Sequence, residues 1–123
     1  MTSSGNLANY YAGISYLKLG RYDAAIAYLQ DFKPAGEVAP ILKFGALGDA
    51  FSENGEMEKA VTFYKKAVNS EDNEFITPYY LNKLGMLLRS LQRHDEAAPY
   101  FKRILENYPS ATEANNVGKY ISE

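Results

Sequence analysis

One stretch decides the fold: residues 47–67, which read LGDAFSENGEMEKAVTFYKKA. Its first half places Gly48 shortly before the large apolar Phe51, and its second half places Ala60 shortly before Tyr64. An Asn-Gly dipeptide separates the two halves. Two antiparallel helices that cross closely need small residues where their backbones approach, with large residues beside them. The stretch therefore predicts a helix hairpin.

The same pattern occurs three times along the chain. A glycine is followed by a large residue three positions later, an alanine twelve positions later and another large residue sixteen positions later. The three sets are Gly13, Tyr16, Ala25 and Leu29; Gly48, Phe51, Ala60 and Tyr64; and Gly85, Leu88, Ala97 and Phe101. Successive copies are 35 and 37 residues apart. A repeat of this length is typical of stacked helix pairs, not of one globular core around a catalytic pocket.

Apolar periodicity, together with Gly, Asn and Pro punctuation, predicts a helix in each half of every copy and a further helix at the end. The expected ranges are 6–19, 22–32, 40–53, 57–68, 78–91, 95–108 and, for the last helix, 111–122. Residues 1–5 are small and polar and are expected to be disordered, and residues 69–77 are expected to form a flexible joint. Ser110 and Glu113 have the spacing of a capping box. Gln92 replaces the glycine of the two earlier turns, so we expect the third turn to close differently.

The composition argues for an ordinary folded protein and against several classes. The 123 residues are 46% hydrophobic and 23% charged. The net charge of −2, from 13 basic and 15 acidic residues, argues against a nucleic-acid partner, for which a basic excess is expected. The absence of cysteine excludes disulfides and thiolate metal sites. The sequence shows neither a long apolar run nor a leader pattern, so we expect no membrane-inserted segment within these residues.

Residues with catalytic potential are few. His94 is the only histidine and falls in a predicted turn beside Asp95 and Glu96. With no second histidine and no cysteine, it cannot form a metal triad or the usual nucleophile–base pair. The glycines are spread at repeat spacing, so a phosphate-binding loop is also not indicated. We therefore expect no catalytic, cofactor or metal site, and no enzyme activity.

These spacings resemble the tetratricopeptide repeat. The matching residues are Ala12-Gly13, Tyr16, Gly20, Tyr22, Ala25 and Leu29; Leu47-Gly48, Phe51, Gly55, Met57, Ala60, Tyr64 and Ala67; and Leu84-Gly85, Leu88, Ala97, Phe101 and Pro109. The resemblance implies an all-α solenoid of three antiparallel helix pairs and a C-terminal capping helix. It also implies one domain over residues 6–123, with repeats at about 6–36, 38–72 and 78–109.

Residues 73–85 are also similar to bacterial envelope proteins of this family, which carry an N-terminal membrane helix ahead of their repeats. This similarity implies that the chain is the soluble part of a longer bacterial protein. It leaves open whether the repeats lie on the periplasmic side of such a membrane-anchored parent or in the cytoplasm.

In this family, the first helices of successive pairs line a concave groove that holds an extended peptide or a partner helix. By position, the resemblance implies a groove formed by Tyr10, Ile14, Lys18, Asp49, Glu53, Tyr79, Asn82, Lys83, Met86 and Arg89, with Leu17, Leu42 and Ser52 beside them. Such a groove would be apolar at one end, acidic in the middle and basic at the other. It predicts a non-catalytic scaffold for a protein or peptide partner that carries both apolar anchors and charges.

Some members of the family grip a chaperone's C-terminal carboxylate, but of the corresponding positions here only Lys83 has a suitable charge, so that role is not expected. The alternative that remains is a structural assembly module that acts through its end faces. Leu7, Tyr11, Ile14 and Leu17 give the first helix a broad apolar surface, which would suit a homo-oligomer or docking within a membrane-anchored parent.

Overall fold

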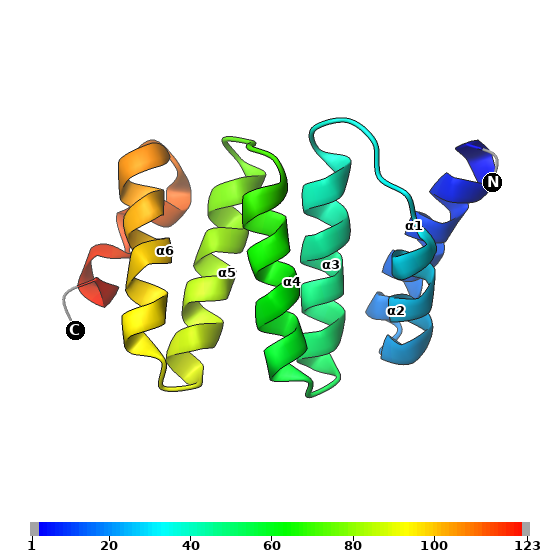
Figure 1. Ribbon diagram of the computed structural model, residues 1–123, viewed down its shortest axis with the longest axis horizontal. Coiled ribbons are helices and arrows are strands. Elements are labelled where there is room, and N and C mark those ends of the chain that lie inside the picture. The colour runs from blue at the N-terminus through cyan, green and yellow to red at the C-terminus, as the bar shows by residue number, and fades with distance from the viewer. Residues whose placement is uncertain (1–2, 122–123) are drawn as a thin grey trace.

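The computed structural model describes residues 3–121, which contain six α-helices and no strand. The helices are α1 (Ser3–Lys18), α2 (Tyr22–Asp31), α3 (Ala39–Glu53), α4 (Met57–Ser70), α5 (Ile76–Ser90) and α6 (His94–Asn107). Two short 3-10 turns follow, η1 (Thr112–Asn115) and η2 (Gly118–Tyr120). The helices form antiparallel pairs set side by side, with α1 and α2 at one end of the row and α6 at the other (Figure 1). The predicted α-solenoid of helix pairs is confirmed.

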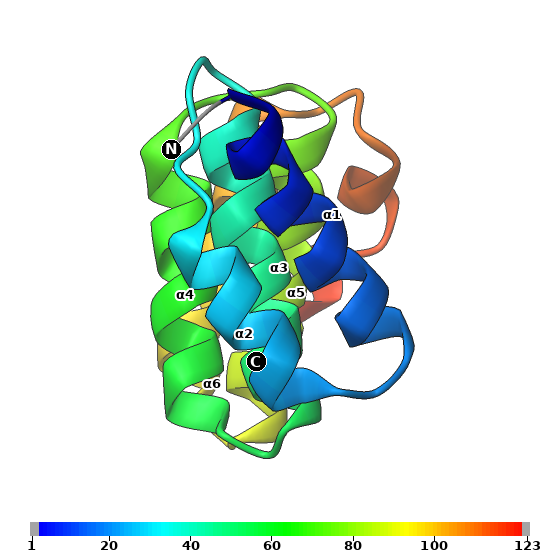
Figure 2. The same cartoon turned by 90° about the vertical axis from the view of Figure 1, so that its right-hand side faces the viewer.

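The pairs are not parallel to one another. Seen along the row, α1 and α2 are inclined to the nearly upright α3 and α4 (Figure 2). A small rotation between neighbouring pairs is what gives a solenoid its extended concave surface. The first helices of the pairs, α1, α3 and α5, therefore approach one another on one side of the molecule.

The repeated glycines make room for the large side chain sixteen residues later. A Cβ atom added to each glycine would lie far inside van der Waals distance of that side chain. From the added Cβ atom to the nearest side-chain atom, the distance is 2.6 Å for Gly13 and Leu29, 2.5 Å for Gly48 and Tyr64, and 2.4 Å for Gly85 and Phe101. The alanines of the repeat, Ala25, Ala60 and Ala97, are fully buried, and the larger side chain is the one nearest to the glycine's open position.

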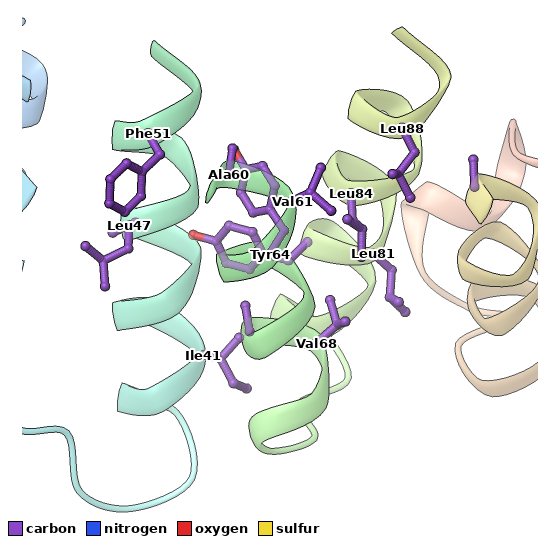
Figure 3. Close-up of a cluster of buried hydrophobic side chains, with 14 of the residues drawn as sticks. Ile41, Leu47, Phe51, Ala60, Val61, Tyr64, Val68, Leu81, Leu84 and Leu88 are labelled. Carbon is purple, nitrogen blue, oxygen red and sulfur yellow. The ribbon is translucent and has the colours of Figure 1, made fainter. Parts of the chain in front are cut away.

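Successive pairs share one hydrophobic core. One cluster of buried side chains includes Leu47 of α3, Val68 of α4 and Leu84 of α5. In Figure 3, Val68 and Leu84 lie between α4 and α5, while Leu47 lies on the other side of α3. Leu47 and Leu84 are fully buried. Because each pair completes its core against the next one, stability in such stacks comes from the interfaces as well as from the repeats themselves.

All three turns within the pairs close in the same way. The residues Gly20, Gly55 and Gln92 have φ angles of +76°, +81° and +63°. In each turn the next backbone N–H donates to the carbonyl five residues earlier: Arg21 to Tyr16 at 2.9 Å, Glu56 to Phe51 at 2.9 Å and Arg93 to Leu88 at 2.8 Å. This is the Schellman arrangement. The expectation that the third turn closes differently was wrong, because these hydrogen bonds hold Gln92 in a conformation that suits glycine better.

Both ends of the solenoid also differ from the sequence-based expectation. Helix α1 begins at Ser3, so residues 3–5 are helical and not disordered, while residues 1–2 lie outside the described residues. The expected capping helix at 111–122 is replaced by the two 3-10 turns as far as the structure describes it. No side-chain cap bond forms at η1, so the capping box is not made. Asn115, Asn116 and Gly118 have low helix propensity, which explains the broken segment.

The segment still covers the end of the stack. Val117 is only 2% exposed, and the Tyr120 ring lies 5.0 Å from the Phe101 ring, centroid to centroid. The joint before α5 is also more ordered than expected. Asn73 Oδ1 accepts hydrogen bonds from the Phe75 and Ile76 N–H groups, both at 2.9 Å, which leads the chain into the helix.

The left-handed residue in the third turn gives a test of this account. Replacing Gln92 with glycine should raise the free energy of unfolding by about 1 kcal/mol, because a non-glycine residue is strained at positive φ. The reverse change, Gly55→Ala, should lower it by a similar amount. Thermal denaturation followed by circular dichroism would measure both, with shifts of roughly 3–5 °C expected. A lower melting temperature for Gln92→Gly would contradict the account.

Candidate binding site

Residues from all three helix pairs line one hollow of about 310 Å³, which we call the central hollow. Its lining residues are Leu17 from α1, Tyr22 from α2, Asp49, Ser52 and Glu53 from α3, Tyr64 from α4 and Lys83 from α5. No single pair could form it. The hollow exists because the stacking brings α1, α3 and α5 together.

Asp49 is the centre of this site. Its Oδ1 atom accepts a hydrogen bond from the Tyr64 hydroxyl at 2.5 Å and another from Lys83 Nζ at 2.8 Å. The Asp49 and Lys83 side chains are 24% and 34% exposed, so the pair is only partly screened by water. Charge-assisted hydrogen bonds of this kind are stronger than neutral ones. They tie α3 to both α4 and α5 and fix the position of the Asp49 carboxylate.

The environment determines which groups are charged. Burial, followed by the nearby Asp49 carboxylate, raises the pKa of the Tyr64 hydroxyl well above its ordinary value. The same two causes raise the pKa of Tyr80. Burial acts to lower the pKa of Lys83, but its hydrogen bonds to Asp49 and Tyr79 outweigh that effect and the net pKa is raised. Near neutral pH, Tyr64 is therefore a neutral donor, and Lys83 is a cation.

Aromatic rings support Lys83 on a second side. Its Nζ atom lies 4.9 Å from the centre of the Tyr79 ring and 5.9 Å from that of Tyr80. The two rings meet edge to face at 5.0 Å. A Cβ on Gly45 would come within 2.1 Å of the Tyr80 ring, so Gly45 is what allows Tyr80 to lie there. The cation–π contacts add to the ion pair in holding Lys83 in place.

Only three of the ten residues predicted for the groove line the central hollow. Asp49, Glu53 and Lys83 line the central hollow, together with the neighbouring Leu17 and Ser52. The expected acidic middle and basic end do not stay separate, because Asp49 and Lys83 neutralise each other.

Three predicted residues lie elsewhere, against the C-terminal segment. Asn82 and Met86 line a second hollow of about 310 Å³, which is completed by Thr112, Glu113, Asn116, Val117 and Tyr120. The Arg89 guanidinium lies 4.3 Å from the centre of the Tyr120 ring. The two 3-10 turns pack against α5 and α6, and none of these three residues lines the central hollow.

The remaining predicted residues do not line the central hollow. The Tyr10 ring packs 5.2 Å from that of Phe32, and Ile14 packs against the core. Lys18 is exposed at the last residue of α1, and Tyr79 is 44% exposed at the start of α5.

Tyr22 and Tyr64 were missed because the sequence reading assigned the groove to first helices alone. A signal was present for Tyr64. The equivalent positions hold Leu29 and Phe101, so only Tyr64 brings a hydroxyl to this buried position, and a buried tyrosine hydroxyl usually needs a partner.

Metal-ligating side chains do not cluster in the described part of the chain. Within residues 3–121, no three side chains that could hold a metal ion lie together. His94 is the first residue of α6, and its ring nitrogens lie 3.2 Å from Arg89 Nη1 and 3.4 Å from Gln92 Oε1. It is therefore part of the packing of the third turn. In the same range, no helix is both long and apolar enough to cross a membrane.

Fold and site together define a helical-repeat protein with a polar hollow that all three helix pairs line. Sequence models of the tetratricopeptide repeat match residues 7–33, 44–74 and 81–111, one segment for each helix pair. The chain belongs to the tetratricopeptide repeat family. Repeats of this family generally mediate protein–protein interactions, and its members are typically non-catalytic scaffolds.

A curated relative shares part of the chain. Over 50 residues the chain is 46% identical to anaphase-promoting complex subunit 8 of Arabidopsis thaliana. The alignment covers 41% of this chain and 8% of that protein. The similarity therefore concerns the repeats and not the whole subunit. Since this relative is from a plant, the resemblance to bacterial envelope proteins remains a prediction.

The Tyr64 hydroxyl provides a test of the site's architecture. Tyr64→Phe should lower the free energy of unfolding by about 1–3 kcal/mol, because it removes a hydrogen bond to a partly buried carboxylate. Tyr100→Phe is the matched control, since Tyr100 packs against the core but its hydroxyl makes no hydrogen bond within residues 3–121. Urea denaturation would compare the two. Equal effects would show that the Asp49 bond contributes nothing.

Alkaline pH should destabilise the fold through the same residues. The pKa values of Tyr64 and Tyr80 are raised in the folded state, so above about pH 10 the unfolded chain loses these protons first. The unfolded state then binds fewer protons, and stability falls as pH rises, by up to about 1.4 kcal/mol per pH unit for each tyrosine. Urea denaturation at pH 9, 10 and 11 would measure the slope. The slope should be shallower in Tyr64→Phe, and an unchanged slope would contradict the assignment.

Proposed function

We propose that this protein is a non-catalytic interaction module that holds an extended peptide or a partner helix on the concave face of α1, α3 and α5. The observation that carries the proposal is the composition of the central hollow. Leu17, Glu53 and Lys83 come from three different repeats and line the same recess. A surface that needs the whole stack is what an extended ligand would contact across several repeats.

The state of the site supports binding with little rearrangement. Asp49 already forms an ion pair with Lys83, and the same carboxylate accepts a hydrogen bond from the Tyr64 hydroxyl. Side chains that are fixed before binding lose little conformational entropy when a ligand arrives. Tyr79 and Met86, which are 44% and 41% exposed, add apolar surface from α5 that a partner could cover.

An end-face assembly module is the second candidate. Leu7 and Tyr11 lie one turn apart on α1 and are 47% and 61% exposed. Large apolar side chains in this position are typical of an interface. One experiment can separate the two candidate functions, because the concave face and the outer face of α1 are distinct surfaces.

The test begins with selection of binders from a random 12-residue peptide library displayed on phage. The tightest peptide would then be titrated into the isotopically labelled protein, and amide chemical shifts followed by NMR. We expect the largest shifts at Leu17, Ser52, Glu53 and Tyr79. Shifts confined to Leu7, Tyr11 and their neighbours would support the end face instead. Failure to select any binder would count against a peptide groove.

A further inference from the structure

We infer that the central hollow is a subsite for one basic side chain, lysine or arginine, of the bound segment. The inference rests on the proposed function, because it assigns the chemistry of the ligand at that same site. It predicts that the bound segment carries a basic residue at the position that contacts α3. Three observations lead to it: the charge of the hollow, its walls and the poor fit of other side chains.

The charge of the hollow favours a cation. Asp49 and Glu53 lie four residues apart on α3, and so on the same face, and both line the hollow. Of the seven lining residues, Lys83 alone is a cation, and its Nζ is already bonded to Asp49 Oδ1. The lining therefore has a net charge of −1. Within residues 3–121, neither Asp49 Oδ2 nor the Glu53 carboxylate has a hydrogen bond or ion pair, so both can accept donors from a ligand.

The walls suit the stem of such a side chain. Leu17 and Tyr22 are half-buried and line the hollow from the first repeat. The aliphatic stems of lysine and arginine commonly lie along apolar surface while the charged group reaches a polar partner. A tyrosine ring can also attract the cation itself. At about 310 Å³ the hollow is at the small end of ligand pockets, which suits a side chain better than a whole helix.

Other side chains fit less well. An acidic residue would meet the Glu53 carboxylate, and Lys83 could receive it only by giving up part of its bond to Asp49. An apolar residue would take Glu53 and Asp49 out of water without replacing the lost hydrogen bonds, which is unfavourable. A basic residue alone satisfies both free carboxylate positions and leaves the Asp49–Lys83 pair intact.

The experiment uses the peptides selected from the random library and four variants of the full chain. We expect most of the selected peptides to contain a lysine or arginine at one aligned position. Replacing that residue with norleucine, which keeps the aliphatic stem, should weaken binding about twofold to fivefold, the range of a partly exposed ion pair. Glu53→Gln should weaken the unmodified peptide by a similar factor and leave the norleucine peptide unchanged. Glu53→Lys should weaken the unmodified peptide more than tenfold and favour a peptide with glutamate at that position.

Two controls keep the test specific. Glu106→Gln and Glu106→Lys change an exposed glutamate on α6 that lines neither hollow, so they should leave the affinity unchanged. Calorimetric titration would give the affinities, and circular dichroism would check that every variant is folded. Peptides that map to the concave face but bind equally well with norleucine, or to Glu53→Gln, would overturn the basic subsite and leave the proposed function standing. Peptides that map elsewhere, or no selected peptides at all, would overturn both.

Discussion

The contact between a glycine of one helix and a large side chain of the next helix underlies every pair in this solenoid. With no Cβ at Gly48, the Tyr64 ring lies directly against the backbone of α3, and Gly13 and Gly85 do the same for Leu29 and Phe101. Protein interiors are close-packed, so such a contact fixes how near and in what register two helices can lie. The size of the inserted side chain varies among the pairs, but the open position that receives it does not.

The same contact connects the core to the candidate site. Tyr64 fills the space beside Gly48 with its ring, and Figure 3 shows its oxygen directed toward α3. There the hydroxyl donates to Asp49, the residue that follows the glycine, and Asp49 in turn accepts from Lys83 of the next pair. A side chain that belongs to the hydrophobic core thus also orients the carboxylate at the centre of the hollow. The packing of the core therefore fixes the position of this carboxylate.

The C-terminal segment decides how much of the concave side is open. Arg89 lies over Tyr120, while Asn82 and Met86 border the hollow that the segment closes. Here residues 112–120 pack against α5 and α6 in two short 3-10 turns and lie beside these three side chains. The part of the concave side nearer α1 and α3 is left with Glu53 as a carboxylate that has no partner within residues 3–121.

The sequence by itself determined the repeat, the order of the six helices, the family and the positions of the turns, because all of these depend on residue types and their spacing along the chain. Apolar periodicity and small residues are local signals, and they act within one helix or one pair. Only the tertiary structure decided that Asp49 pairs with Lys83, 34 residues away, since this depends on the rotation between neighbouring pairs. It also decided the positive φ of Gln92, which shared backbone hydrogen bonds impose against the residue's own preference.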